Sequence, residues 1–249
     1  MHTAVDNGIN FIDVSPYYGH YKAETVLGKA LKEIPRDKYY LSTKVGRYGK
    51  DGVNTWDYSA KRVTDSVYES MERLNIDYID LINVHDVEFA DLNQIVNETL
   101  PALVALRDKG VVGHVGITDL QPENLKWVIE HVPSGTVESV LNFCHYSLND
   151  EMLLDYLDFF EANGVGVVNA SPFSMGLLSR RGAPAWHPAP ESLKQACRRA
   201  AEHCEARNYP IEKLAVQYST SNPRIATTLF SKSRQRAQEH RLRQRDYGQ

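Results

Sequence analysis

The sequence GINFIDVSPYYG, residues 8–19, joins a glycine, a short apolar run and a polar segment with two adjacent tyrosines. Glycine is the usual residue just after a helix, because it adopts positive φ without steric cost. The apolar run behind it, residues 9–14, is nearly continuous, as parallel strands buried on both faces are. We therefore interpret residues 1–7 as the end of a helix that stops at Gly8, and residues 9–14 as a buried strand.

The same succession of strand and helix patterns continues along the 249 residues. Apolar runs rich in Val, Ile and Tyr predict strands at 9–14, 39–44, 78–85, 113–118, 139–144, 165–170 and 225–230. Apolar residues three and four apart predict helices at 23–33, 59–75, 91–109, 122–131, 150–163, 191–208 and 211–220. So regular a repeat predicts an α/β fold, a (β/α)₈ barrel in preference to a doubly wound sheet. No Gly-x-Gly-x-x-Gly pattern follows an early strand, which argues against a Rossmann sheet.

Composition restricts the partners and the compartment. The net charge of −4 gives no reason to expect nucleic acid or an anionic membrane as a partner. Three irregularly spaced cysteines do not form a disulfide framework, so a reducing, cytosolic compartment is expected. Cys197, His203 and Cys204 lack a fourth ligand nearby, so no metal site is predicted.

Four ionisable residues lie where the first three predicted strands end: Asp13, Tyr18, Lys44 and His85. Active sites of α/β barrels lie at the carboxyl ends of the strands. A lysine that ends an apolar strand needs a partner for its charge, and Asp13 on the neighbouring strand is the candidate. Taken singly, these residues have ordinary structural interpretations: an ion pair, a loop aromatic and a strand-end histidine. Together they suit general acid–base chemistry on a carbonyl or alcohol oxygen.

These residues belong to motifs that resemble those of the aldo-keto reductase family over about residues 1–230. The matching segments are residues 8–13 with 18–19, 42–44, 80–85, 116–118, 170–172 and 176–178. The resemblance implies a barrel that binds NAD or NADP without a Rossmann fold, as a monomer or weak homodimer. It implies that Tyr18 is the general acid/base, that Lys44 and Asp13 tune it, and that His85 orients the substrate.

The resemblance also implies a set of cofactor contacts. Thr118 and Asp119 occupy the place where a Ser-Asn pair usually holds the nicotinamide carboxamide, and Asn142 replaces the usual Gln. Ala170 stands where many members stack an aromatic ring on the nicotinamide. The full implied set is Asp13, Thr118, Asp119, Asn142, Ser171, Phe173, Met175 and Leu177.

Longer segments resemble the plant branch of the family that oxidises L-galactose at C1. They are HDVEF at 85–89, QIVNET at 94–99, CHYSLND at 144–150 and GVGVVNASP at 164–172. This similarity implies NAD-linked oxidation of L-galactose to L-galactono-1,4-lactone, a small-molecule reaction on the way to ascorbate. NADP stays open as the cofactor. The alternatives are another aldose, aldehyde or ketone as substrate, or an inactive truncated form that serves as a binding module.

The two ends of the chain depart from the family pattern. The usual N-terminal hairpin and first strand have no counterpart in the sequence, so we expect residues 1–230 to form a barrel that is incomplete at its N-terminus. Residues 231–249 form a basic tail with few large apolar side chains. We expect at most a frayed, solvated helix there.

Overall fold

Strands and helices alternate along the chain much as the sequence predicts. The structure is a computed structural model that describes residues 1–50 and 53–231. It divides into two compact units at strand β7 (Ser139–Phe143). The first unit contains residues 1–140 with 163–165, and the second contains 141–162 with the described residues from 166 onward. Apart from Ser231, the predicted basic tail at 231–249 lies outside the described residues.

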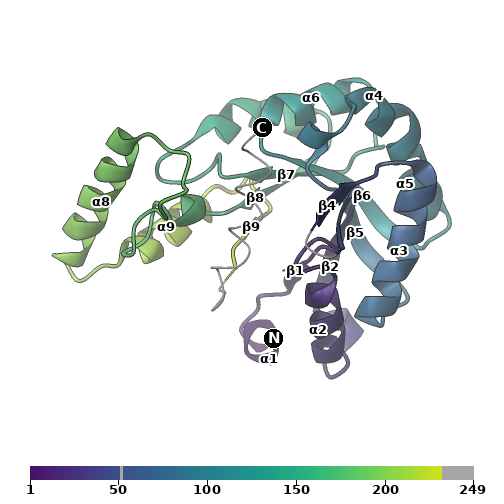
Figure 1. The fold of residues 1–249 in the computed structure, drawn as a ribbon, viewed down its shortest axis with the longest axis horizontal. Coiled ribbons are helices and arrows are strands. Elements are labelled where there is room, and N and C mark those ends of the chain that lie inside the picture. Colours follow the sequence, from purple (N-terminus) through teal and green to yellow (C-terminus); the bar gives the residue numbers. More distant parts are fainter. Residues whose placement is uncertain (51–52, 232–249) are drawn as a thin grey trace. The chain divides into compact units, whose positions relative to one another are not determined.

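The first unit is built on parallel strands in the order β1-β2-β5-β6. Their bounds are Phe11–Asp13, Tyr40–Val45, Ile79–Val84 and Val112–Asp119. The helices between them are α2 (Lys22–Leu31), α3 (Ala60–Leu74) and α5 (Leu100–Asp108). Helix α6 (Pro122–Glu130) follows β6, and the short α1 (His2–Asp6) precedes β1. Helices α2, α3 and α5 lie side by side along these strands (Figure 1).

Burial on both faces explains why the strands read as continuous apolar runs. Leu41, Ile82 and Val115 are fully buried in neighbouring strands. Helix α2 comes unusually close to α3 at Gly28, where an added Cβ would lie 2.3 Å from the Arg73 carbonyl oxygen. The first unit therefore has a tightly packed helix layer behind a sheet with apolar side chains on both faces.

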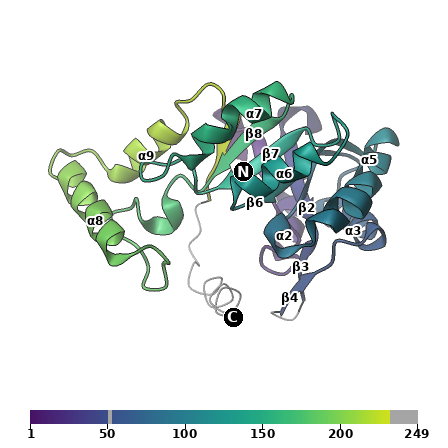
Figure 2. The same ribbon diagram turned by 90° about the horizontal axis from the view of Figure 1, so that it is seen from above.

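A hairpin that the sequence analysis did not predict follows β2 at its carboxyl end. It consists of β3 (Arg47–Lys50) and β4 (Val53–Trp56), which pair in an antiparallel manner. Gly46 turns the chain into it with φ of +96°. Figure 2 shows this hairpin extending away from the parallel strands. Strands of four residues without apolar alternation carry almost no sequence signal, which is why the pattern missed them.

The predicted helix at 91–109 is interrupted. It begins as α4 (Leu92–Gln94), passes through a π-helical turn, η3 (Ile95–Thr99), and continues as α5. Its predecessor on the chain is the short 3₁₀ turn η2 (Val87–Phe89). Single π turns inside helices are invisible to a 3.6-residue period and commonly occur near functional sites.

The second unit contains the end of β7, β8 (Gly166–Ala170) and β9 (Thr227–Leu229), with β8 and β9 parallel. Its helices are η4 (Met152–Tyr156), α7 (Leu157–Ala162), η5 (Ser174–Gly176), α8 (Glu191–Glu205) and α9 (Ile211–Ser219). Leu177 and Leu178 belong to one buried apolar cluster with Cys197 of α8 and Ile211 of α9. In the described part of the chain, no helix is long and apolar enough to cross a membrane.

Candidate active site

Four of the predicted site residues come together in the first unit. Asp13 is the last residue of β1, Lys44 lies near the end of β2, and His85 directly follows β5. Tyr18 lies in the turn after β1, where its N–H donates to the Ser15 carbonyl at 3.1 Å. Parallel pairing of β1, β2 and β5 brings these positions to one edge of the sheet.

Lys44 and Asp13 form a buried ion pair. The Lys44 Nζ lies 2.5 Å from Asp13 Oδ2 and donates a second hydrogen bond to the Val14 carbonyl at 3.0 Å. The lysine is only 2% exposed. Burial by itself would lower the pKa of Lys44, but the charges of Asp13 and Tyr18 and the hydrogen bond to Asp13 outweigh it and raise the pKa above its usual value. Lys44 is therefore a permanent cation at neutral pH.

Hydrogen bonds from the neighbouring strands hold the Asp13 carboxylate in place. Its Oδ1 accepts a hydrogen bond from Ser42 Oγ at 2.9 Å. The Ser42 hydroxyl in turn accepts from Asn83 Nδ2 at 3.0 Å. The carboxylate thus keeps hydrogen-bond partners on both oxygens, which a buried charge requires.

Tyr18 lies between the ion pair and the histidine. The Lys44 Nζ is 5.1 Å from the centre of the Tyr18 ring. The same ring meets the His85 imidazole edge-on, with 5.9 Å between the ring centres. One phenol is therefore next to both a fixed cation and an imidazole, the combination that the sequence pattern pointed to.

The His85 imidazole is fixed from two sides. Its Nδ1 lies 3.2 Å from Ser15 Oγ, and its Nε2 lies 3.5 Å from Asp86 Oδ1. The Tyr58 hydroxyl donates to the His85 and Asp86 carbonyl oxygens at 2.8 and 2.9 Å. The backbone of the histidine is thus held as firmly as its ring.

Thr118 and Asp119, at the end of β6, lie in the same unit and make contacts within it. The Asp86 N–H donates to Thr118 Oγ1 at 2.8 Å. Asp119 accepts from the Gln121 N–H at 2.6 Å, at the start of α6. Burial raises the pKa of Asp119 to about 6. Burial and the charges of Asp86 and Asp119 raise the pKa of Glu88 to about 9.

The other predicted cofactor contacts belong to the second unit. Asn142 is buried in β7, and Ser171 follows β8 with φ of +62°. Phe173 and Leu177 both pack against the cluster beneath α8 and α9, so Leu177 would offer backbone rather than side-chain atoms to a ligand. Met175 lies in η5 with φ of +50°. Their roles toward a cofactor stay predictions.

In the first unit, Thr118 fits a nicotinamide cofactor, because its hydroxyl is 2% exposed and can both donate to and accept from a carboxamide. In the second unit, the buried side-chain amide of Asn142 has the same capacity. Asp119 differs from the usual Asn because a carboxylate can accept hydrogen bonds but donates none when ionised.

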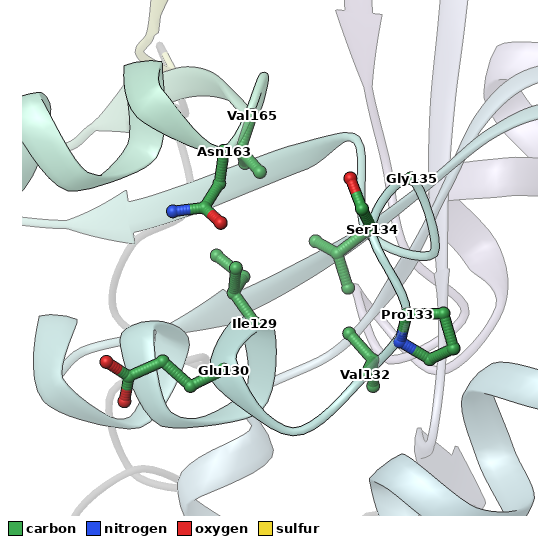
Figure 3. A pocket seen from close by; sticks show the side chains of 9 residues that line it. Ile129, Glu130, Val132, Pro133, Ser134, Gly135, Asn163 and Val165 are labelled. Carbon is green, nitrogen blue, oxygen red and sulfur yellow. The ribbon is translucent and has the colours of Figure 1, made fainter.

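The pocket in Figure 3 is separate from these residues. It has a volume of about 260 Å³, and its lining includes Ile129, Glu130, Pro133 and Val165. These residues precede β7 and β8, at the ends of the strands opposite to those where chemistry occurs in α/β barrels. Glu130 is its single ionisable lining residue in the described part of the chain. The pocket therefore plays no part in the candidate site.

Sequence reasoning overlooked several residues that support the site. Ser15, Ser42 and Asn83 hold the Asp13 and His85 side chains, and Tyr58 holds the backbone at His85. Arg47, from the unpredicted hairpin, pairs with Asp86 at 2.5 Å. Ser42 could have been identified from the sequence, because it lies two residues before Lys44 on β2 and therefore on the same face of the strand. Tyr58 and Arg47 depend on a long-range approach that no local spacing reveals.

Comparisons with known proteins identify the family. The model of the aldo/keto reductase family matches residues 1–244. L-galactose dehydrogenase of Arabidopsis thaliana is 48% identical over 228 residues, which are 91% of this chain and 70% of that protein. D-arabinose 1-dehydrogenase of Saccharomyces cerevisiae is 36% identical, over 88% of this chain and 67% of that protein.

A solved structure, the holo form of aldo-keto reductase AKR11C1 from Bacillus halodurans, is similar with a TM-score of 0.75 and 28% identity. The match covers 91% of this chain and 74% of that one. The predicted fold class, an α/β barrel of aldo-keto reductase type, is thereby confirmed.

Proposed function

The chain belongs to the aldo/keto reductase family, and on that premise we propose that it oxidises an aldose at C1 with a nicotinamide cofactor, with L-galactose as substrate. The observation that carries this proposal is the cluster of Asp13, Tyr18, Lys44 and His85 at one edge of the sheet. The 48% identity to an L-galactose dehydrogenase supports the substrate. We further propose NAD as cofactor, with NADP as the second choice, and a cytosolic reaction.

In this proposal Tyr18 takes the proton from the anomeric hydroxyl. The fixed charge of Lys44, 5.1 Å from the ring centre, favours the phenolate form that can accept this proton. Asp13 holds the lysine in place and keeps the pair neutral overall. Without that carboxylate, the buried ammonium would carry an uncompensated desolvation penalty.

His85 orients the substrate in this proposal. Its edge-on contact with Tyr18, with 5.9 Å between the ring centres, supports a hydrogen bond from the imidazole to the same oxygen that Tyr18 serves. When bound, the nicotinamide supplies the hydride acceptor, and the protein supplies position and the proton acceptor. Thr118 would hold its carboxamide by the donor chemistry given above.

A second aldose, D-arabinose, is favoured by the 36% identity to a D-arabinose 1-dehydrogenase. Initial-rate assays of NAD and NADP reduction distinguish between these two proposed substrates. The compounds tested are L-galactose, D-arabinose, L-fucose and pyridoxal. We expect the highest kcat/KM for L-galactose with NAD. A higher value for another substrate would replace the proposed substrate, and no turnover of any substrate with either cofactor would refute the proposed activity.

A further inference from the structure

Arg47, the first residue of the β3–β4 hairpin, is buried beside the candidate site in an aromatic setting. Its guanidinium carbon lies 3.9 Å from the centre of the Tyr17 ring and 4.5 Å from that of Trp56. The rings of Trp56 and Phe89 stack with 4.4 Å between their centres. A planar, weakly hydrated guanidinium suits such a setting, whereas a lysine ammonium would lose most of its hydration without gaining the stacking contact.

The guanidinium pairs with the residue that follows the candidate histidine. Arg47 Nη1 lies 2.5 Å from Asp86 Oδ2, and the arginine side chain is 6% exposed. The other carboxylate oxygen, Oδ1, lies 3.5 Å from His85 Nε2. A distance of 3.5 Å is longer than a good N–H···O hydrogen bond, so the carboxylate is near the imidazole without capturing it.

The backbone at Asp86 is held in an unusual conformation that sets this geometry. Its φ of +48° lies in the left-handed region, which residues with a Cβ seldom adopt. The Tyr58 hydroxyl donates to its carbonyl oxygen, and its N–H donates to Thr118 Oγ1. This unfavourable backbone conformation thus places the Asp86 carboxylate between a guanidinium and an imidazole.

The hydrogen bonds of Ser15 indicate which imidazole nitrogen carries the proton. Ser15 Oγ accepts the Tyr17 N–H at 3.1 Å. Its own hydroxyl hydrogen can then be donated to His85 Nδ1 at 3.2 Å. This favours the neutral tautomer with hydrogen on Nε2, the nitrogen that faces Asp86.

An ionised carboxylate beside an imidazole N–H has two effects. It attracts the N–H toward itself, and it stabilises the imidazolium. Either effect would remove the neutral donor that orients a substrate oxygen. Arg47 counteracts both, because it draws the carboxylate by its far oxygen and neutralises its charge.

We propose that Arg47 is a positioning residue that holds the Asp86 carboxylate away from His85 Nε2 and keeps the imidazole a neutral hydrogen-bond donor for the substrate. This inference rests on the proposed role of His85. The inference goes further because it assigns a role in the reaction to the hairpin that carries Arg47.

In the described part of the chain, other ionisable side chains lie near the imidazole or near the Asp86 carboxylate, and all of them stay unchanged in the variants below. They are Tyr17, Tyr18 and, behind Tyr17, His20 from the turn after β1, Lys44 with Asp13 behind it, Tyr58 after β4, Glu88 in η2 and Asp119 at the end of β6. A change confined to Arg47 or Asp86 therefore reports on this pair.

The test is the NMR titration of the His85 imidazole in the full chain between pH 5 and 9, with the signal assigned by its loss in His85→Gln. In Arg47→Met the titration midpoint should rise by on the order of one pH unit, because the carboxylate is left unneutralised. In Asp86→Asn it should fall, because the guanidinium is left unneutralised. The double variant should return close to the wild-type midpoint.

The matched control is Arg62→Met. Arg62 also pairs with a carboxylate, Glu69, and packs over an aromatic ring, Tyr48, in the same unit. It should leave the His85 midpoint unchanged. Asp86→Asn provides the decisive result if Arg47→Met does not fold.

An unchanged midpoint in Asp86→Asn, an unchanged midpoint in a folded Arg47→Met, or a rise that persists in the double variant would overturn the proposal. The titration needs no substrate, so it succeeds or fails independently of the proposed activity. Turnover of L-galactose by the wild-type chain tests that activity separately.

Discussion

Replacing Lys44 by methionine tests how much the Asp13–Lys44 pair contributes to the stability of the fold and how much it contributes to catalysis. Methionine has a similar length and fits an apolar site, so the main change is loss of the ammonium. Asp13 would be left with the hydrogen bond from Ser42 at 2.9 Å and without its 2.5 Å contact to the lysine. The carboxylate side chain is 10% exposed, so water replaces little of what is lost.

The expected loss of stability follows from that burial. Removing one partner of a buried ion pair costs about 3–5 kcal/mol, and the remaining hydrogen bond to Asp13 places Lys44→Met near 3 kcal/mol. For a chain of this length, that corresponds to a fall in Tm of roughly 6–12 °C. The double variant Asp13→Asn, Lys44→Met removes the uncompensated charge and should recover at least about half of the loss.

Urea unfolding and NAD-linked turnover, measured on the same preparations, separate the two roles. The double variant should recover stability but stay inactive, because Tyr18 still lacks its cation. The pKa of Lys44 is raised in the folded state, so the contribution of the pair is complete below the ordinary lysine value and is lost only as the pH rises through the folded value. The stability difference should therefore be the same at pH 6 and pH 9.

Lys61→Met is the matched control. Lys61 also lies 2.5 Å from an aspartate, Asp65, but its side chain is 86% exposed. Its removal should change stability by less than about 0.5 kcal/mol. If Lys44→Met is as stable as Lys61→Met, or if the double variant regains activity, the reasoning about the buried pair is wrong.

Two further predictions concern the surroundings of the site. Gly46→Ala should lower the free energy of unfolding, measured in urea, by about 2 kcal/mol or more, because the added Cβ would lie 2.3 Å from the Tyr58 ring at positive φ. Gly110→Ala is the control and should cost clearly less, because its added Cβ meets no atom within 4 Å. Equal losses in the two variants would contradict the steric argument. Burial and two neighbouring carboxylates raise the pKa of Glu88 to about 9, so the wild-type chain should lose stability as the pH rises from about 4.5 toward 9. Glu88→Gln should flatten that decline in urea titrations at pH 5, 7 and 9, and an identical slope in the two proteins would refute the assignment.

The order of strands and helices was predictable because burial on both faces makes parallel strands apolar throughout. The ends of β1, β2 and β5 were equally visible, since an apolar run that stops at Asp13, Lys44 or His85 departs from its own pattern. The hairpin after Gly46 was not predictable, because its strands are short and show no apolar alternation. For the same reason, Arg47, which lies in this hairpin, was not identified from the sequence as a site residue.

The supporting shell of the site depends on contacts across the sequence. Tyr58 reaches the backbone at residues 85 and 86, and Ser15 reaches the His85 ring. Such hydrogen bonds join residues that are 27 to 70 positions apart, and nothing in the local sequence around either partner specifies the other. The candidate residues could be found from the sequence, but the means by which they are held could not.

Steady-state oxidation of L-galactose with NAD by Tyr18→Phe tests the central claim most directly. Phenylalanine keeps the ring that contacts His85 and removes only the hydroxyl that is proposed to accept the proton. Tyr68→Phe on α3, where the tyrosine is exposed, is the matched control and should keep wild-type turnover. We predict that Tyr18→Phe lowers kcat by about 10²- to 10⁴-fold while NAD still binds. Turnover near the wild-type rate in Tyr18→Phe would contradict the proposed chemistry.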